Sequence, residues 1–199
     1  MLATVALGAQ AQVVTKPKEF YFKQDPSTAR PIVVVEGEGE ALAAGLVKAR
    51  ERGRRQVEAT AQLAHVAMAD NRIELGKQLY EQAVSGAAAN STVGRSIRWN
   101  YAWDLYRNGD FAQAFGLWNE LASGFGEPDW VPATLALSLW SLDRKAEAVQ
   151  WYAAAMRTEP NRWGDPANYP ALLPGWREQE RARLAEVFAA WQAAPPAWP

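Results

Sequence analysis

The sequence contains no cysteine and a single histidine, His65. The absence of cysteine excludes disulfide bonds, thiolate metal sites and cysteine nucleophiles. The shortage of histidine excludes metal sites built from several imidazoles. No apolar stretch approaches the roughly 20 residues that a membrane-spanning helix needs. We therefore expect neither a metal nor another cofactor, and contact with a membrane only at its periphery.

Recognisable catalytic motifs are also missing. The sequence has no G-x-S-x-G, Walker, H-E-x-x-H or dinucleotide-binding pattern. His65 lies in an alanine-rich helical stretch, with no sequence signal for the partner that a general base needs. Lys and Arg number 21 against 22 Asp and Glu, which argues against nucleic acid as a partner because phosphates require a basic surface. We expect a protein that is not an enzyme.

The N-terminal residues have features of an exported protein. Leu2 to Gly8 is a short apolar run, and Ala9-Gln10-Ala11 has the small-x-small form that signal peptidase accepts. We expect residues 1–11 to be a signal-peptide remnant and the mature protein to be periplasmic. The basic residues that usually precede such a run are missing. A frayed apolar N-terminus on a cytoplasmic protein is therefore the alternative.

A change in composition divides the chain near residue 38. Residues 12–37 include EFYF (19–22) and PIVVVEG (31–37), and each predicts a short strand or an extended segment. We expect them to form an extended arm. Beyond residue 38, Ala, Leu, Glu, Arg and Gln dominate, and all five favour helices. Helices are expected near residues 38–52, 55–69, 72–85, 95–108, 111–124, 131–142, 145–157 and 176–193.

The helical part contains a pattern that recurs. Ala114 and Ala148 lie 34 residues apart, and the positions around them match in side-chain size. A third unit lies upstream, where Gly76 takes the place of Ala114. Small residues at helix crossings let two helices approach, so residue size recurs although residue identity does not. The other matched positions are Ala102 with Ala136, Leu105 with Leu139, Trp118 with Tyr152, and Tyr80 with Trp118.

This spacing resembles the tetratricopeptide repeat, a 34-residue helix–turn–helix unit. The resemblance covers about residues 57–162. It implies an all-α fold, a right-handed α-solenoid of about three hairpins within a helical domain of residues 38–193. The expected boundaries are repeats at 57–94, 95–128 and 129–162, a capping helix at 176–193 with an apolar stripe of Leu184, Val187, Phe188 and Trp191, and a tail at 194–199.

Aromatic residues form a second stripe on the first helices of the expected repeats. In tetratricopeptide repeats, the equivalent positions line a concave groove that binds partner peptides. The resemblance therefore implies a scaffold that binds a protein or an extended peptide. Two alternatives stay open: the chain itself fills the groove, or the protein is a glycan-binding protein or carbohydrate-active enzyme of the cell wall. The candidate groove residues are His65, Trp99, Trp103, Tyr106, Trp130 and Trp140.

Overall fold

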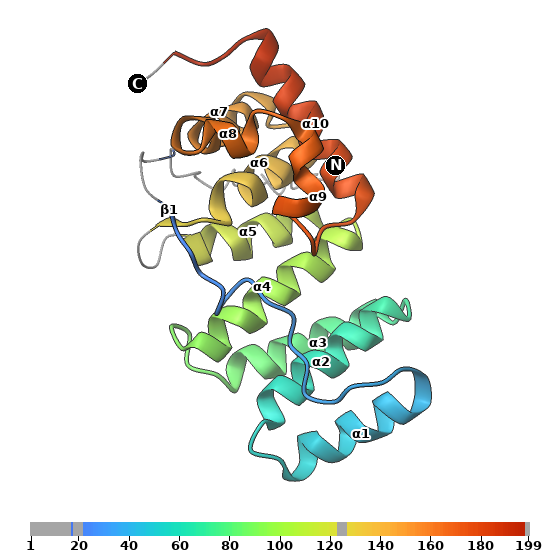
Figure 1. Ribbon diagram of the computed structural model, residues 1–199. Coiled ribbons are helices and arrows are strands. Elements are labelled where there is room, and N and C mark those ends of the chain that lie inside the picture. The colour runs from blue at the N-terminus through green and yellow to red at the C-terminus, as the bar shows by residue number, and fades with distance from the viewer. Residues whose placement is uncertain (1–16, 18–21, 123–126, 198–199) are drawn as a thin grey trace, which may run out of the picture.

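The computed structural model describes residues 17, 22–122 and 127–197 and is almost wholly helical, which confirms the all-α class (Figure 1). Two strands of two residues, β1 (Phe22–Lys23) and β2 (Glu127–Pro128), form a parallel pair. The helices are α1 (Gly39–Arg52), α2 (Gln56–Ala69), α3 (Ile73–Ser85), α4 (Thr92–Arg107), α5 (Phe111–Ala122), α6 (Val131–Ser141), α7 (Lys145–Thr158), α8 (Pro160–Trp163), the 3₁₀ helix η1 (Pro166–Asn168), α9 (Tyr169–Leu172) and α10 (Glu178–Ala193).

Consecutive helices pack as three hairpins, α2 with α3, α4 with α5, and α6 with α7. The first helix of each hairpin ends in the same turn. One residue of the turn has a left-handed backbone conformation, and the N–H of the residue after it donates a hydrogen bond to the carbonyl five residues earlier. That pattern is a Schellman motif, which satisfies carbonyls at a helix end. The left-handed residues are Asn71, Gly109 and Asp143, and the closing bonds are Arg72 to Ala67, Asp110 to Leu105 and Arg144 to Leu139, at 2.8–2.9 Å.

Small residues occupy the places where the helices of a hairpin meet. Ala114 on α5 and Ala148 on α7 are fully buried. Gly76 on α3 is buried as well, and a Cβ atom there would lie 2.1 Å from Cγ of Met68 on α2. Side chains larger than these would push the paired helices apart. The residues matched between the repeats above are buried, namely Ala102, Leu105, Trp118, Ala136, Leu139 and Tyr152 at the 34-residue spacing and Tyr80 of the upstream unit.

Of the N-terminal arm, the structure describes residue 17 and residues 22–37, which contain a two-residue strand and a turn at 26–28 but no helix. Of the EFYF stretch only Phe22 lies within the described residues, where it begins β1. Residues 31–37 form no strand, and the chain bends at Val34 and Val35. From β1 the arm runs past the start of α6 and across α4 to α2 and α1 (Figure 1). It therefore lies against the first helix of every hairpin.

The C-terminal part returns over the hairpins. The expected loop after α7 instead contains the short helices α8 and α9 and the 3₁₀ helix η1. Three prolines start these turns, since proline fits the first turn of a helix. Helix α10 then packs against α6 and α7 through the stripe of Leu184, Val187 and Phe188. It lies against both helices of the last hairpin.

Residues 1–11, interpreted above as a signal-peptide remnant, lie outside the described residues. Among the helices that are described, none is long and apolar enough to cross a membrane.

Replacing Ala114 by leucine should lower the free energy of unfolding by about 1–3 kcal/mol, because a larger side chain has to enter a filled helix crossing. Gln113, the neighbouring residue, is exposed, and Gln113→Leu should change it little. Urea unfolding of both variants measures the difference. Equal tolerance at the two positions would contradict the observed packing.

Candidate functional site: a cleft lined by tryptophans

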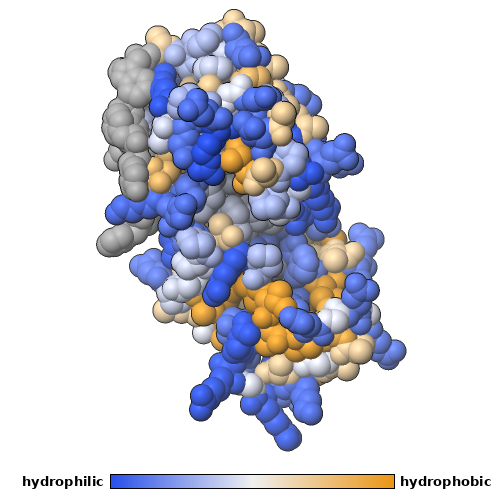
Figure 2. All heavy atoms as spheres, viewed as in Figure 1, coloured by the Kyte–Doolittle hydropathy of each residue, from blue (hydrophilic) through white to orange (hydrophobic). Residues whose placement is uncertain are grey.

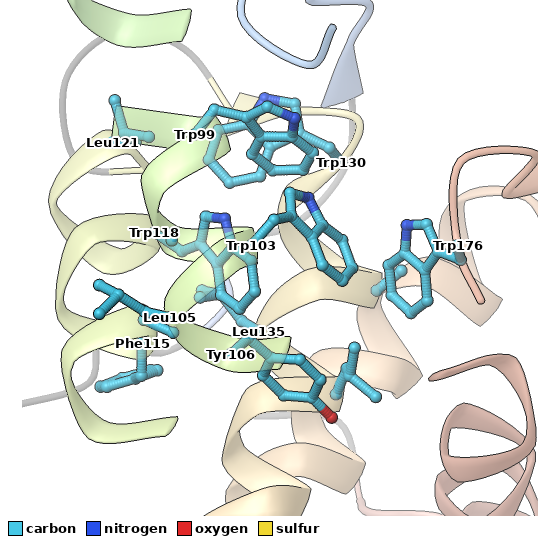
Figure 3. Packing of buried hydrophobic residues seen from close by; sticks show 14 of the residues in the cluster. Trp99, Trp103, Leu105, Tyr106, Phe115, Trp118, Leu121, Trp130, Leu135 and Trp176 are labelled. Carbon is cyan, nitrogen blue, oxygen red and sulfur yellow. The ribbon is translucent and has the colours of Figure 1, made fainter. Parts of the chain in front are cut away.

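The aromatic stripe of α4 forms the centre of one aromatic cluster. The ring centroid of Trp103 lies 5.0 Å from that of Trp118 on α5 and 5.0 Å from that of Trp176, which precedes α10. Trp99, one turn earlier, lies 4.8 Å from Trp130 at the start of α6. Figure 3 shows these rings meeting between α4, α6 and the segment that carries Trp176. Four separate parts of the chain thus share one aromatic core.

The expected groove is largely filled by the chain itself. Trp99 and Trp103 are each 7% exposed, Tyr106 is 5% and Trp130 is 8%. Asp25 of the arm contacts Trp130 on one side, and Trp176 packs against Trp103 on the other. Most of this face therefore fits the alternative in which the groove is filled by other parts of the same chain.

Trp140 and Tyr106 serve other contacts. The indole N–H of Trp140 donates to Glu186 on α10 at 2.8 Å, and the ammonium of Lys145 lies 3.7 Å from the ring centre. The hydroxyl of Tyr106 pairs with that of Ser141 at 2.8 Å. Both residues attach α10 and the hairpins to one another.

A cleft of about 370 Å³ remains where the two covering segments do not meet. The arm forms one wall, α4 and α6 form the floor, and residues 159–176 form the opposite wall. Of the six expected groove residues, Trp99, Trp103, Trp130 and His65 line it. Lining residues that the sequence analysis missed include Asp104, Thr134, Trp163, Leu173 and Trp176.

Buried polar contacts hold the far wall in place. The hydroxyl of Tyr152 donates to the carbonyl of Trp163 at 2.6 Å and also pairs with the hydroxyl of Tyr169 at 2.6 Å. Burial raises the pKa of Tyr152 to about 12, so the hydroxyl stays protonated and able to donate at neutral pH. These bonds tie α8 and α9 to α7. The wall is therefore present before any ligand arrives.

Arg107 fixes the end of the same wall. Its guanidinium contacts Glu180 at 2.8 Å, donates to the carbonyl of Gly175 at 3.1 Å and lies 4.9 Å from the ring centre of Trp103. The Glu180 side chain is 5% exposed, so the pair is largely screened from water, and loss of either partner would leave an uncompensated charge. Helix α10 and α4 are joined at this point.

His65 and Asp104 form a pair at the edge of the cleft. Nδ1 of His65 lies 2.9 Å from Oδ2 of Asp104, and the hydroxyl of Tyr80 donates to the same oxygen at 2.6 Å. The hydrogen bond with Asp104 raises the pKa of His65 above 6.5, while partial burial opposes the change. Asp104 thus orients the imidazole, and Nε2 of His65 has no partner among the described residues.

This pair has the arrangement of an oriented general base. In the part of the chain that the structure describes, however, no serine or threonine hydroxyl is hydrogen bonded to His65. The same part holds no group of three His, Asp or Glu side chains that could bind a metal ion. Thr134 contributes a different polar feature, because it lines the cleft and its buried Oγ1 has no hydrogen-bond partner there.

Sequence signals existed for some of the missed residues. Trp163 and Trp176 flank a proline-rich segment, and Asp104 is a carboxylate between two apolar residues of a helix. Nothing in the local pattern, however, indicates that the segment after α7 returns to α4.

Replacing Trp103 by alanine should lower the free energy of unfolding by about 3–5 kcal/mol, because this ring is buried among four other aromatic rings. Trp140→Ala removes a ring that is only half-buried and should cost clearly less. Denaturant unfolding of both variants tests this. A stable Trp103→Ala protein would show that the ring is not part of the core.

The imidazole of His65 should titrate above pH 6.5, and Asp104→Asn should lower that pKa. Since the folded-state pKa is raised, the stabilising effect of the pair is complete below pH 6.5 and disappears as the pH rises through the folded-state value. His65 is the only histidine in the sequence, so NMR of the untagged protein follows it directly. An unshifted pKa in the wild type would contradict the pairing.

Comparisons with protein-family models, with curated proteins and with solved structures found no match to this chain. The function is therefore inferred from the geometry of the chain itself.

Proposed function

We propose that this protein is a non-enzymatic binding scaffold of the tetratricopeptide type, a right-handed solenoid of three hairpins that binds a partner protein through the tryptophan-lined cleft. Three features support the repeat architecture. The hairpins have matched small residues at their crossings, the 34-residue spacing recurs, and each hairpin closes with the same turn.

The observation that carries the proposal is the preformed cleft. Its volume of about 370 Å³ lies at the lower end of the range for ligand pockets. Five tryptophans line it, namely Trp99, Trp103, Trp130, Trp163 and Trp176. Aromatic rings beside a few fixed polar groups are typical of binding sites, because the rings provide apolar contact area and the polar groups set orientation.

We propose a short extended segment of a partner protein as the ligand. The cleft can hold only a few residues, and its walls include the apolar side chains of Leu173 and Pro174. Backbone amides of such a segment could pair with Oγ1 of Thr134 and Nε2 of His65. Charges in the cleft are largely paired, as Arg162 is with Glu159 at 2.8 Å. This balance favours a neutral peptide over nucleic acid, whose phosphates require unpaired basic groups.

We also propose that the protein acts in the bacterial periplasm. We further propose that it uses no cofactor. Export is supported by the apolar run and the small-x-small pattern within residues 2–11.

An array of acetylated tetrapeptide amides, scanned for binding to the full chain, tests the proposal. Thr134→Val keeps the side-chain shape and removes the hydroxyl. It should weaken binding of the selected peptides about fivefold, because a hydrogen bond contributes about 1 kcal/mol, without lowering the melting temperature. Leu75→Asp changes an exposed leucine on α3 and is the control.

A glycan is the second candidate, since tryptophans beside carboxylates and amides are also suited to sugars. The same proteins are therefore titrated with chitotriose. Binding of the sugar that is sensitive to Thr134→Val, in the absence of peptide binding, would replace the peptide proposal. Peptide binding unaffected by Thr134→Val would remove the cleft as its site.

A further inference from the structure

The arm is held at its C-terminal end by one glutamine of α2. Oε1 of Gln62 accepts from the N–H of Val34 at 2.6 Å and from that of Val35 at 3.1 Å, while Nε2 donates to the carbonyl of Val35 at 2.7 Å. The amide of Gln62 thus satisfies both backbone groups of Val35, as a neighbouring strand would. Gln62 is 8% exposed, so these bonds are shielded from water. They would form with any residue other than proline at position 35.

Helix α4 holds the middle of the arm in a similar way. Nδ2 of Asn100 donates to the carbonyl of Arg30 at 2.8 Å. The guanidinium of Arg95 contacts the carboxylate of Asp25 at 3.2 Å and donates to the hydroxyl of Thr28 at 3.1 Å. Gln62 and Asn100 thus contact the backbone of the arm, whereas Arg95 contacts a carboxylate and a hydroxyl of its side chains.

The carboxylate of Asp25 is the most specific point of attachment. Besides Arg95, the indole N–H of Trp130 donates to it at 3.3 Å. Burial by itself would raise the pKa of Asp25, but the hydrogen bonds from its neighbours together lower it, so the group is ionised at neutral pH. An acidic side chain is therefore matched to the charge of Arg95 at this end of the face.

A pair of glycines joins the arm to the helical body. Gly37 has φ of +124° and Gly39 has φ of +60°, conformations that other residues adopt only with strain. The arm thus folds back on the body through a connection of two glycines. Val33 on the arm is 49% exposed, and Figure 2 shows apolar side chains gathered on the face where the arm crosses α2. Most of the arm lies at the surface, although Thr28 is fully buried and Ala29 and Ile32 pack against the core.

We propose that the face formed by Gln62, Arg95 and Asn100 is a binding site for an extended segment of another protein, and that the arm occupies this site in the free protein. The partner segment carries a carboxylate for Arg95, followed about ten residues later by two residues, neither of them proline, whose backbone pairs with Gln62. The chain's own arm shows that this chemistry fits the face.

This site goes beyond the cleft described above. Gln62 and Arg95 are not among the residues that line the cleft, although Asn100 is, and residues 24–31 of the arm form one of its walls. Displacing the arm would remove that wall and extend the cleft along α4 towards α2. The two proposals fail separately, because Thr134→Val tests the cleft and Gln62→Ala tests the arm-binding face.

The experiment uses the full chain and a fluorescein-labelled synthetic peptide with the sequence of residues 23–36. The double variant Gly37→Ala and Gly39→Ala strains the connection and releases the arm. It should bind the peptide at least tenfold more tightly than the wild type does, because the attached arm no longer competes. Adding Gln62→Ala should reduce that affinity at least tenfold. Gln56→Ala, a change at an exposed glutamine on the same helix, should leave it unchanged.

Hydrogen exchange at the amides of Val34 and Val35 reports arm release independently. Release of these amides without any gain in peptide affinity would overturn the proposal. The glycine variant could leave the amides of Val34 and Val35 protected. In that case, excess peptide should accelerate the exchange of these amides in the wild type, and a lack of acceleration would overturn the proposal. A dimer of the glycine variant in light scattering, with the amides protected, would show that the occupant is the arm of a second copy and not a different protein.

Discussion

The packing of Trp103 joins three parts of the chain and sets the shape of the candidate site. Its ring meets Trp118 on the paired helix and Trp176 ahead of α10, and the guanidinium of Arg107 lies over it. An exposed indole on α4 would cost free energy in water, so the return of the C-terminal segment over this face is favourable. The far wall of the cleft exists because that segment returns.

Covering the aromatic face changes what it can bind. An open groove would present whole indole rings to a long peptide. Here the rings are at least nine-tenths buried, and the space between the arm and residues 159–176 admits a few residues of a ligand. Recognition in such a cleft depends on the polar groups that line it, among which Thr134 on the floor and the oriented imidazole of His65 at the edge have capacity for a further hydrogen bond.

The two covering segments are attached by different chemistry. Residues 159–176 are held by aromatic packing, by the hydroxyl of Tyr152 and by a buried ion pair, which together make a rigid wall. The arm is held largely through its backbone, by side-chain amides and one arginine. Backbone contacts tolerate a change of sequence, whereas a packed aromatic core does not. This difference is why the arm, and not the C-terminal wall, is the segment that a partner could replace.

Local pattern was sufficient for the helices. The eight long helices begin and end within about three residues of the positions expected from composition and spacing, because helix propensity and end signals act over a few residues. The 34-residue spacing likewise identified the buried small residues Ala114 and Ala148. Four of the six candidate groove residues line the cleft, since helical periodicity places side chains of one stripe on one face.

The amino-acid sequence by itself determined the helices, their pairing into hairpins and the existence of a second aromatic stripe. Only the tertiary structure decided what covers that stripe. His65 and Asp104 are 39 residues apart, and Arg107 and Glu180 are 73 apart. Contacts at such separations depend on how whole hairpins stack and on where the last segment returns. Periodicity shows which residues share a face, but it carries no information about the distant segment that packs against it.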